Sequence, residues 1–131
     1  MNIDEIVAWF TAKRRPSLGR DEAITLLNSA HPRTLFVKTL RHGARLLDVG
    51  AGDGGLEVFR RWPPPARADL RMYAYSLEKG QRFDAYDGFE LGNWESGPPA
   101  FPGIEFNAMF CSHFIEHIAD PQPFLKWTAQ R

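Results

Sequence analysis

The sequence predicts an α/β fold with a mostly parallel sheet, preceded by N-terminal helices. Three observations support this prediction. Residues 1–43 show the apolar spacing of amphipathic helices. Short apolar runs typical of buried strands follow, and strands and helical patterns then alternate. The first of these strands leads directly into a glycine-rich turn at residues 50–55, which a further helical pattern follows.

Helical patterns account for most of residues 1–43. Apolar side chains recur at i, i+3, i+4 and i+7 in residues 3–15, where Asn2 is placed to cap the helix. A second helix is expected over residues 21–28. A third is expected over residues 32–40, because proline is favourable in a first helical turn. Residues 1–43 are therefore predicted to form a helical segment ahead of the core.

The core is expected in residues 44–131, where short apolar runs predict strands. These runs cover residues 45–49, 70–75 and 105–111, with a weaker one at 89–91. The helices expected in this part cover residues 56–62, before a run of three prolines, and residues 123–130. Both segments are predicted to belong to one domain.

Composition restricts the function classes. Sixteen basic residues balance sixteen acidic ones, so the net charge offers no long-range attraction to nucleic acid or anionic lipid, and a small-molecule substrate is expected. A single cysteine, Cys111, excludes an intrachain disulfide and a cysteine-rich zinc site, which favours a reducing compartment and predicts a cytoplasmic protein. No apolar run approaches the roughly 20 residues of a membrane helix, so no membrane association is expected.

The glycine-rich turn resembles a known cofactor-binding motif. Gly50, Gly52 and Gly55 form a G-x-G-x-x-G string, which alone is a weak signal because glycine-rich turns are common. The longer string L-L-D-V-G-A-G-D-G over residues 46–54 is similar to the first motif of class I S-adenosylmethionine-dependent methyltransferases. The resemblance implies a Rossmann-like three-layer sandwich that binds S-adenosyl-L-methionine. The cofactor-binding residues it assigns in this motif are Asp48, Gly50, Ala51 and Gly52.

The resemblance implies further cofactor contacts downstream. In the family an acid after the second strand bonds the ribose hydroxyls; Ser76 stands at that place here, and Glu78 follows two residues on. Asn93 matches an Asp that contacts the adenine amino group, and its side-chain oxygen can accept the same hydrogen bond. Trp94 can add apolar or stacking surface to the base.

A second motif lies about 60 residues after the first. The string F-N-A-M-F-C-S-H-F-I-E-H over residues 106–117 is similar to the fourth-strand pattern F-D-x-V-x-x-x-x-x-L-E-H of many small-molecule methyltransferases, with Asn107 in place of Asp. Ligands of open α/β sheets sit at the carboxyl ends of the strands, so Ser112 is expected beside the cofactor. His113 is the candidate catalytic residue, a general base for a substrate hydroxyl or amine.

The same segment leaves two other interpretations open. His113 and His117, with Glu116 between them, spell the H-x-x-E-H zinc signature, which needs a stable helix and a further ligand, whereas Pro121 follows closely. Alternatively, His117 and Glu116 satisfy backbone groups at the strand-to-helix turn.

The family normally continues with three more strands, so the expected fold is truncated after the fourth strand. The strand ending at Cys111 is then expected at an exposed sheet edge, and self-association through this edge is predicted. The leading hypothesis is methyl transfer to an O, N or C nucleophile of a small molecule. The alternatives are a non-catalytic cofactor-binding or interaction module and, less favoured because Asp48 would repel a pyrophosphate, an NAD-dependent dehydrogenase.

Overall fold

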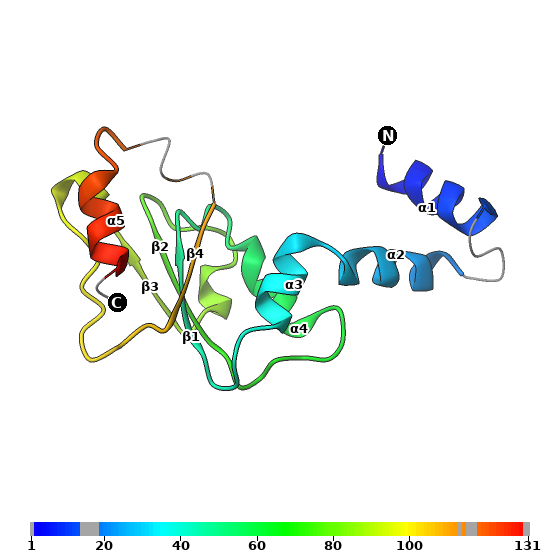
Figure 1. Cartoon of the computed structure of the whole chain (residues 1–131), viewed down its shortest axis with the longest axis horizontal. Coiled ribbons are helices and arrows are strands. Elements are labelled where there is room, and N and C mark those ends of the chain that lie inside the picture. Colours follow the sequence, from blue (N-terminus) through cyan, green and yellow to red (C-terminus); the bar gives the residue numbers. More distant parts are fainter. Residues whose placement is uncertain (1, 14–18, 113, 115–117, 130–131) are drawn as a thin grey trace.

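The computed structural model describes residues 2–13, 19–112, 114 and 118–129. Three helices come first, as predicted: α1 (Ile3–Lys13), α2 (Arg20–Ser29) and α3 (Pro32–Lys38). Asn2 caps α1, because its side-chain oxygen accepts the Glu5 N–H at 2.9 Å while the Glu5 carboxylate accepts the Asn2 N–H. Helices α1 and α2 extend away from the sheet, whereas α3 lies beside it (Figure 1).

The core is a four-stranded, all-parallel sheet in the order β3-β2-β1-β4. Its strands are β1 (Arg45–Val49), β2 (Arg71–Ser76), β3 (Gly88–Leu91) and β4 (Ala108–Cys111). The weak run at 89–91 is thus confirmed as a strand. From β1 the chain adds β2 and β3 on one side and then returns to place β4 on the other side of β1.

Strand β4 begins later than the sequence predicts. The structure has no strand at residues 105–107, and the reason lies at Asn107. Its backbone N–H donates to the Arg45 carbonyl at 3.1 Å, while its side-chain oxygen accepts the Arg45 N–H at 2.8 Å. A side-chain hydrogen bond therefore replaces the backbone bond with which the ladder would continue.

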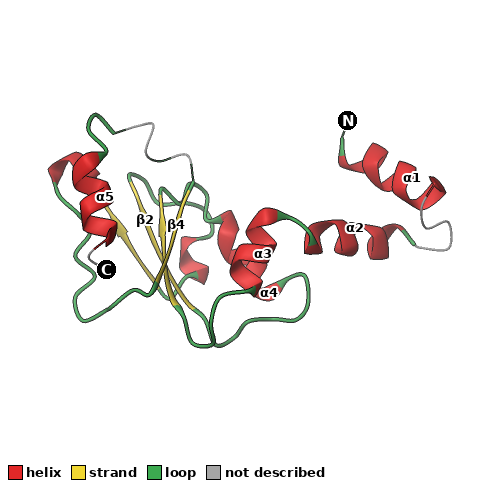
Figure 2. Cartoon of the chain, in the orientation of Figure 1, coloured by secondary structure: helices red, strands yellow, loops and turns green. Residues whose placement is uncertain are grey.

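Helices cover both faces of the sheet, so the fold is a Rossmann-like sandwich of three layers (Figure 2). Helices α3 and α4 (Val58–Arg61) lie over one face, and α5 (Gln122–Ala129) lies over the other. The first face packs the buried side chains of Val37, Leu46, Leu56, Met72, Ala74 and Phe83. The second face packs those of Leu47, Val49, Tyr75, Phe101 and Phe124.

The helix expected at residues 56–62 is shorter in the structure than predicted, because a 3₁₀ turn takes its first residues. The glycine loop passes into a 3₁₀ turn, η1 (Gly55–Glu57), and only then into α4 (Val58–Arg61). The proline run stops α4, because proline has no N–H to donate and clashes with the preceding turn. The connections to β3 and β4 contain only the 3₁₀ turns η2 (Phe83–Ala85) and η3 (Trp94–Ser96).

Within the described residues, β4 is an edge strand whose one neighbour in the sheet is β1, as predicted for the strand ending at Cys111. Self-association through this edge stays a prediction, which light scattering over a range of chain concentrations tests. None of the described helices is long and apolar enough to cross a membrane.

Candidate functional site

The strand order reverses between β1 and β4, and the carboxyl ends of these strands are the usual ligand site of an open parallel sheet. Two cavities open there, and Gly50 and Gly52 line both. The cavity toward β2, of about 220 Å³, is lined by Gly50, Gly52, Tyr75, Ser76, Leu77, Gly92, Asn93, Trp94, Phe114 and Ile118. The cavity toward β4, of about 300 Å³, is lined by Arg33, Asp48, Gly50, Ala51, Gly52, Asp53, Leu56, Phe110 and Ser112.

Most of the residues predicted from the sequence meet at these two cavities. Ser76, Asn93 and Trp94 line the β2-side cavity, and Asp48, Ala51 and Ser112 line the β4-side cavity. Glu78 does not join them, because its side chain is exposed and lines neither cavity. Ser76 is thus the only one of the two candidate ribose residues near the site. His113 lies outside the described residues, as do Glu116 and His117.

Asn93 and Trp94 have structural partners in addition to the cavity. The Asn93 side-chain oxygen accepts the Glu95 N–H at 3.0 Å and thereby caps η3, which fixes the side chain. The Trp94 ring lies edge-on to Phe124 with 5.1 Å between centroids, so it joins the loop to α5. Both side chains are therefore held in place at the cavity wall.

Asp48 is a buried carboxylate at the centre of the site, with only 3% of its surface exposed. Strand alternation puts it on the same face as Leu46, toward α3 and the segment after η2. Burial raises its pKa from 3.8 to about 6. The hydrogen bond from Tyr86 and the positive charge of Arg33 lower the pKa, and the negative charge of Asp53 raises it. The protein thus holds a costly negative charge next to the glycine loop.

Arg33, which the sequence did not single out, brings the opposite charge to the same cavity. It extends from the first turn of α3, and its guanidinium donates to the Ser112 hydroxyl at 3.3 Å. It also lies 5.6 Å from the centroid of the Phe110 ring. One wall of the β4-side cavity is therefore cationic, while Asp48 and Asp53 make the glycine-loop wall anionic.

The backbone N–H groups of the glycine loop are mostly used within the chain. The N–H groups of Gly50 and Ala51 point to the Tyr75 carbonyl, at 2.8 and 3.4 Å, and that of Gly54 donates to Ala51 at 2.9 Å. The Gly55 N–H donates to the Asp53 carboxylate at 2.9 Å. A carboxylate of the protein thus occupies the place at which a phosphate-binding loop presents free donors.

Gly80 lies directly against the glycine loop. The sequence analysis did not predict this contact. A Cβ at this position would lie 2.3 Å from the Gly52 carbonyl oxygen, so only glycine allows this close approach. Two residues on, the Arg82 N–H donates to the Asp53 carbonyl at 2.9 Å. The segment after β2 therefore holds the conformation of the glycine loop.

The described part of the chain contains no group of three or more His, Cys, Asp or Glu side chains placed to hold a metal ion. The zinc interpretation of residues 113–117 falls mostly outside that part. Comparisons with protein-family models, with curated proteins and with solved structures find no match for this chain.

Proposed function

We propose that the chain binds S-adenosyl-L-methionine across the glycine loop and acts as a methyltransferase on a small molecule. The observation that carries this proposal is that Asp48 and Arg33, of opposite charge, line one cavity together with Gly50 and Gly52. The amino-acid end of the cofactor has an ammonium and a carboxylate on one carbon, so it needs both charges within one small volume.

The two cavities match the two ends of this cofactor in character. The β4-side cavity has charged walls and would hold the amino-acid end, with Asp48 facing the ammonium and Arg33 the carboxylate. The β2-side cavity is lined by aromatic and aliphatic side chains together with Asn93 and Ser76, and would hold the adenosine. Gly50 and Gly52 lie between them, where the ligand would pass close to the backbone.

The same features disfavour a nicotinamide dinucleotide. A pyrophosphate needs free N–H donors at the loop, whereas here the Gly55 donor binds Asp53. Asp48 and Asp53 would also repel the negative charge of the pyrophosphate. These contacts favour a cationic sulfonium ligand.

When bound, the sulfonium cofactor supplies an electrophilic methyl group for an O, N or C nucleophile and leaves as S-adenosylhomocysteine. The contribution of this chain would be to position the reactants and exclude water. Ser112, which follows β4 at its carboxyl end, lines the cavity that would hold the amino-acid end of the cofactor. The role of His113 as general base stays a prediction.

Substitution of Gly52 tests the binding proposal with a matched control. Gly52 and Gly43 both have a positive φ, 60° and 73°, and a Cβ at either would meet no atom within 4 Å. Alanine should therefore destabilise both sites similarly, by about 1 kcal/mol. Only the methyl group at position 52 borders the cavities, so Gly52→Ala should weaken S-adenosylhomocysteine binding at least about tenfold in calorimetric titrations.

The Gly43→Ala control should bind like the wild-type protein. Equal affinities for both variants would mean that the ligand does not pass over the glycine loop. A folded wild-type protein that shows no saturable binding would reject the proposed function. Binding without methyl transfer to any acceptor would instead favour the alternative of a non-catalytic cofactor-binding module.

A further inference from the structure

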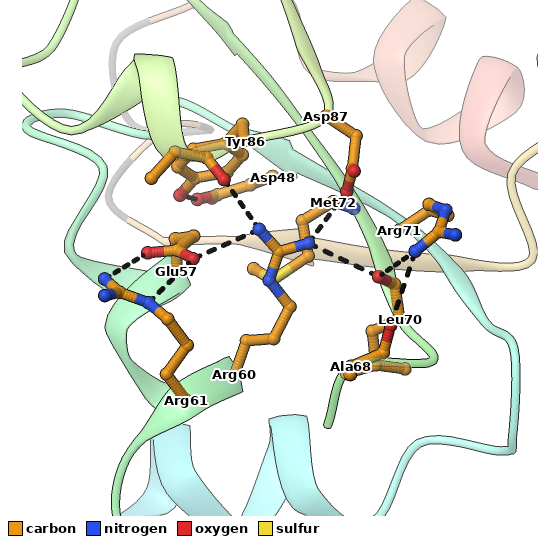
Figure 3. A network of polar contacts seen from close by, with 11 residues as sticks. Asp48, Glu57, Arg60, Arg61, Ala68, Leu70, Arg71, Met72, Tyr86 and Asp87 are labelled. Carbon is orange, nitrogen blue, oxygen red and sulfur yellow. Dashed lines mark hydrogen bonds and ion pairs between the residues drawn. The ribbon is translucent and has the colours of Figure 1, made fainter. Parts of the chain in front are cut away.

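We propose that Tyr86 is a positioning residue, which holds the Asp48 carboxylate in the orientation that binds the ligand, and that Arg60 fixes Tyr86 by binding both of its chain neighbours. This proposal rests on the proposed function, because it concerns how the acid of that site is held. Tyr86 and Arg60 both lie outside the glycine motif that contains Asp48 (Figure 3).

The contact between Tyr86 and Asp48 is short and buried. The Tyr86 hydroxyl donates to Oδ2 of Asp48 at 2.6 Å, and the tyrosine is 7% exposed. Its ring packs edge-on against Phe83, with 5.8 Å between centroids, so the hydroxyl has little freedom to move. Among the described residues Oδ1 of Asp48 has no hydrogen-bond partner, and the side chain lines the β4-side cavity. One carboxylate oxygen is thus held while the other stays available to a ligand cation.

Arg60 binds both chain neighbours of Tyr86, one through its backbone and the other through its side chain. Its guanidinium donates to the Ala85 carbonyl at 2.6 Å and to the Asp87 carboxylate at 2.8 Å. The same Asp87 oxygen accepts the Met72 N–H at 2.8 Å, which ties this segment to β2. Glu57, 1% exposed, accepts a further bond from Arg60 at 3.1 Å and balances its charge. The planar guanidinium therefore sets the position of the loop that carries the hydroxyl.

The groups around Asp48 determine how easily its carboxylate is protonated. Three described groups act on Asp48 from the surrounding elements: Tyr86 after η2, Arg33 from α3 and Asp53 from the glycine loop. The hydroxyl bond favours the charged form of Asp48 and so opposes the effect of burial on its pKa. Glu57 and Asp48 also act on Tyr86, whose pKa is raised by burial and then by the charge of Asp48, so it stays a donor. Loss of the hydroxyl would leave Asp48 easier to protonate and free to rotate.

The test uses Tyr86→Phe, which keeps the packed ring and removes only the donor. S-adenosylhomocysteine affinity is measured by calorimetry from pH 5 to pH 8, a range around the Asp48 pKa of about 6. We expect Tyr86→Phe to bind about tenfold more weakly at pH 7.5. We also expect the affinity of Tyr86→Phe to be lost earlier as the pH falls. The midpoint of this loss should lie about half a pH unit or more above the midpoint for the wild-type protein. Tyr73→Phe, which removes a hydroxyl from the same sheet away from both cavities, should change neither value.

Arg60→Lys is a second variant, which tests the same proposal if Tyr86→Phe does not fold. Lysine keeps the positive charge beside Glu57, but its compact ammonium cannot bind both neighbours of Tyr86 as the guanidinium does. It should shift the pH dependence in the same direction by a smaller amount. An unchanged pH dependence in folded Tyr86→Phe or, should that variant not fold, in Arg60→Lys would overturn the positioning role while leaving the proposed function intact. Absence of binding by the wild-type protein would overturn both.

Discussion

The Asp48→Asn variant is expected to be more stable than the wild-type protein at pH 7 and to lose most of its affinity for S-adenosylhomocysteine. Burial raises the pKa of Asp48 from 3.8 to about 6, and each pKa unit corresponds to about 1.4 kcal/mol. Keeping this carboxylate charged therefore costs the folded state on the order of 3 kcal/mol at neutral pH. Asparagine removes the charge and can still accept the Tyr86 hydroxyl bond. We expect a gain of about 1–3 kcal/mol in the free energy of unfolding.

The gain should depend on pH in a defined direction. A carboxylate whose pKa is raised on folding stabilises the folded state most below its unfolded pKa, and this contribution is lost as the pH rises through the folded pKa. The difference between Asp48→Asn and the wild-type protein should therefore be small below pH 3.8 and reach its full size above about pH 6. Affinity should fall by a factor on the order of 100, because the ligand ammonium loses its counter-ion.

Urea unfolding followed by tryptophan fluorescence, repeated across this pH range, measures the stability difference. Asp84→Asn is the control, because the Asp84 side chain is 78% exposed and its ion pair with Lys79 lies at the surface. Its stability should stay within about 0.5 kcal/mol of the wild-type value. A loss of stability in Asp48→Asn at pH 7 would mean that the charged carboxylate is stabilised by contacts stronger than those described.

Glu57→Ala is expected to cause the largest loss of stability, about 3–5 kcal/mol. Glu57 is 1% exposed and binds two guanidinium groups, with contacts of 3.1 Å to Arg60 and 2.8 Å to Arg61. Removal of Glu57 takes one of its carboxylate partners from Arg60, whose side chain is only 13% exposed. The largely buried positive charge of Arg60 is then less well compensated. The free energy of unfolding from urea titration measures the loss.

The two arginines provide an internal comparison. The Arg61 side chain is 61% exposed, so its ion pair with Glu57 is screened by solvent and Arg61→Ala should cost less than about 1 kcal/mol. A small loss in Glu57→Ala, equal to that in Arg61→Ala, would show that the buried cluster contributes little to stability.

The sequence predicted the parts of this fold that depend on local pattern. Apolar runs and glycine turns are patterns of residues that are adjacent in the sequence. The strand at Arg45–Val49, the turn after it and the helix at Gln122–Ala129 were therefore all expected. The start of β4 was misplaced because the Asn107 side chain takes part in the ladder, which an apolar pattern does not reveal. The short α4 has a similar cause: the 3₁₀ turn takes the first residues of the expected helix.

The sequence predicted many of the residues that line the two cavities but missed Arg33 and Tyr86. Asp48, Ala51 and the glycines lie in one continuous motif, whereas Arg33 and Tyr86 reach the site through packing of α3 and of the segment after η2. Neither residue has a local signal, since a lone arginine in a helix and a tyrosine in a loop are ordinary features. Glu78 was expected near the ribose from its spacing after β2, but the chain turns there and leaves it exposed.

A map of amide chemical shifts during titration with S-adenosylhomocysteine tests the central claim most directly, because it reports both binding and its location. Saturable changes are expected at Gly52, Trp94 and Ser112, around the two cavities. The amides of Gly103 and Glu105, which line a separate cavity at the opposite end of the sheet, should stay unchanged. Saturable changes confined to that opposite end, or none at any concentration of ligand, would contradict binding at the glycine loop.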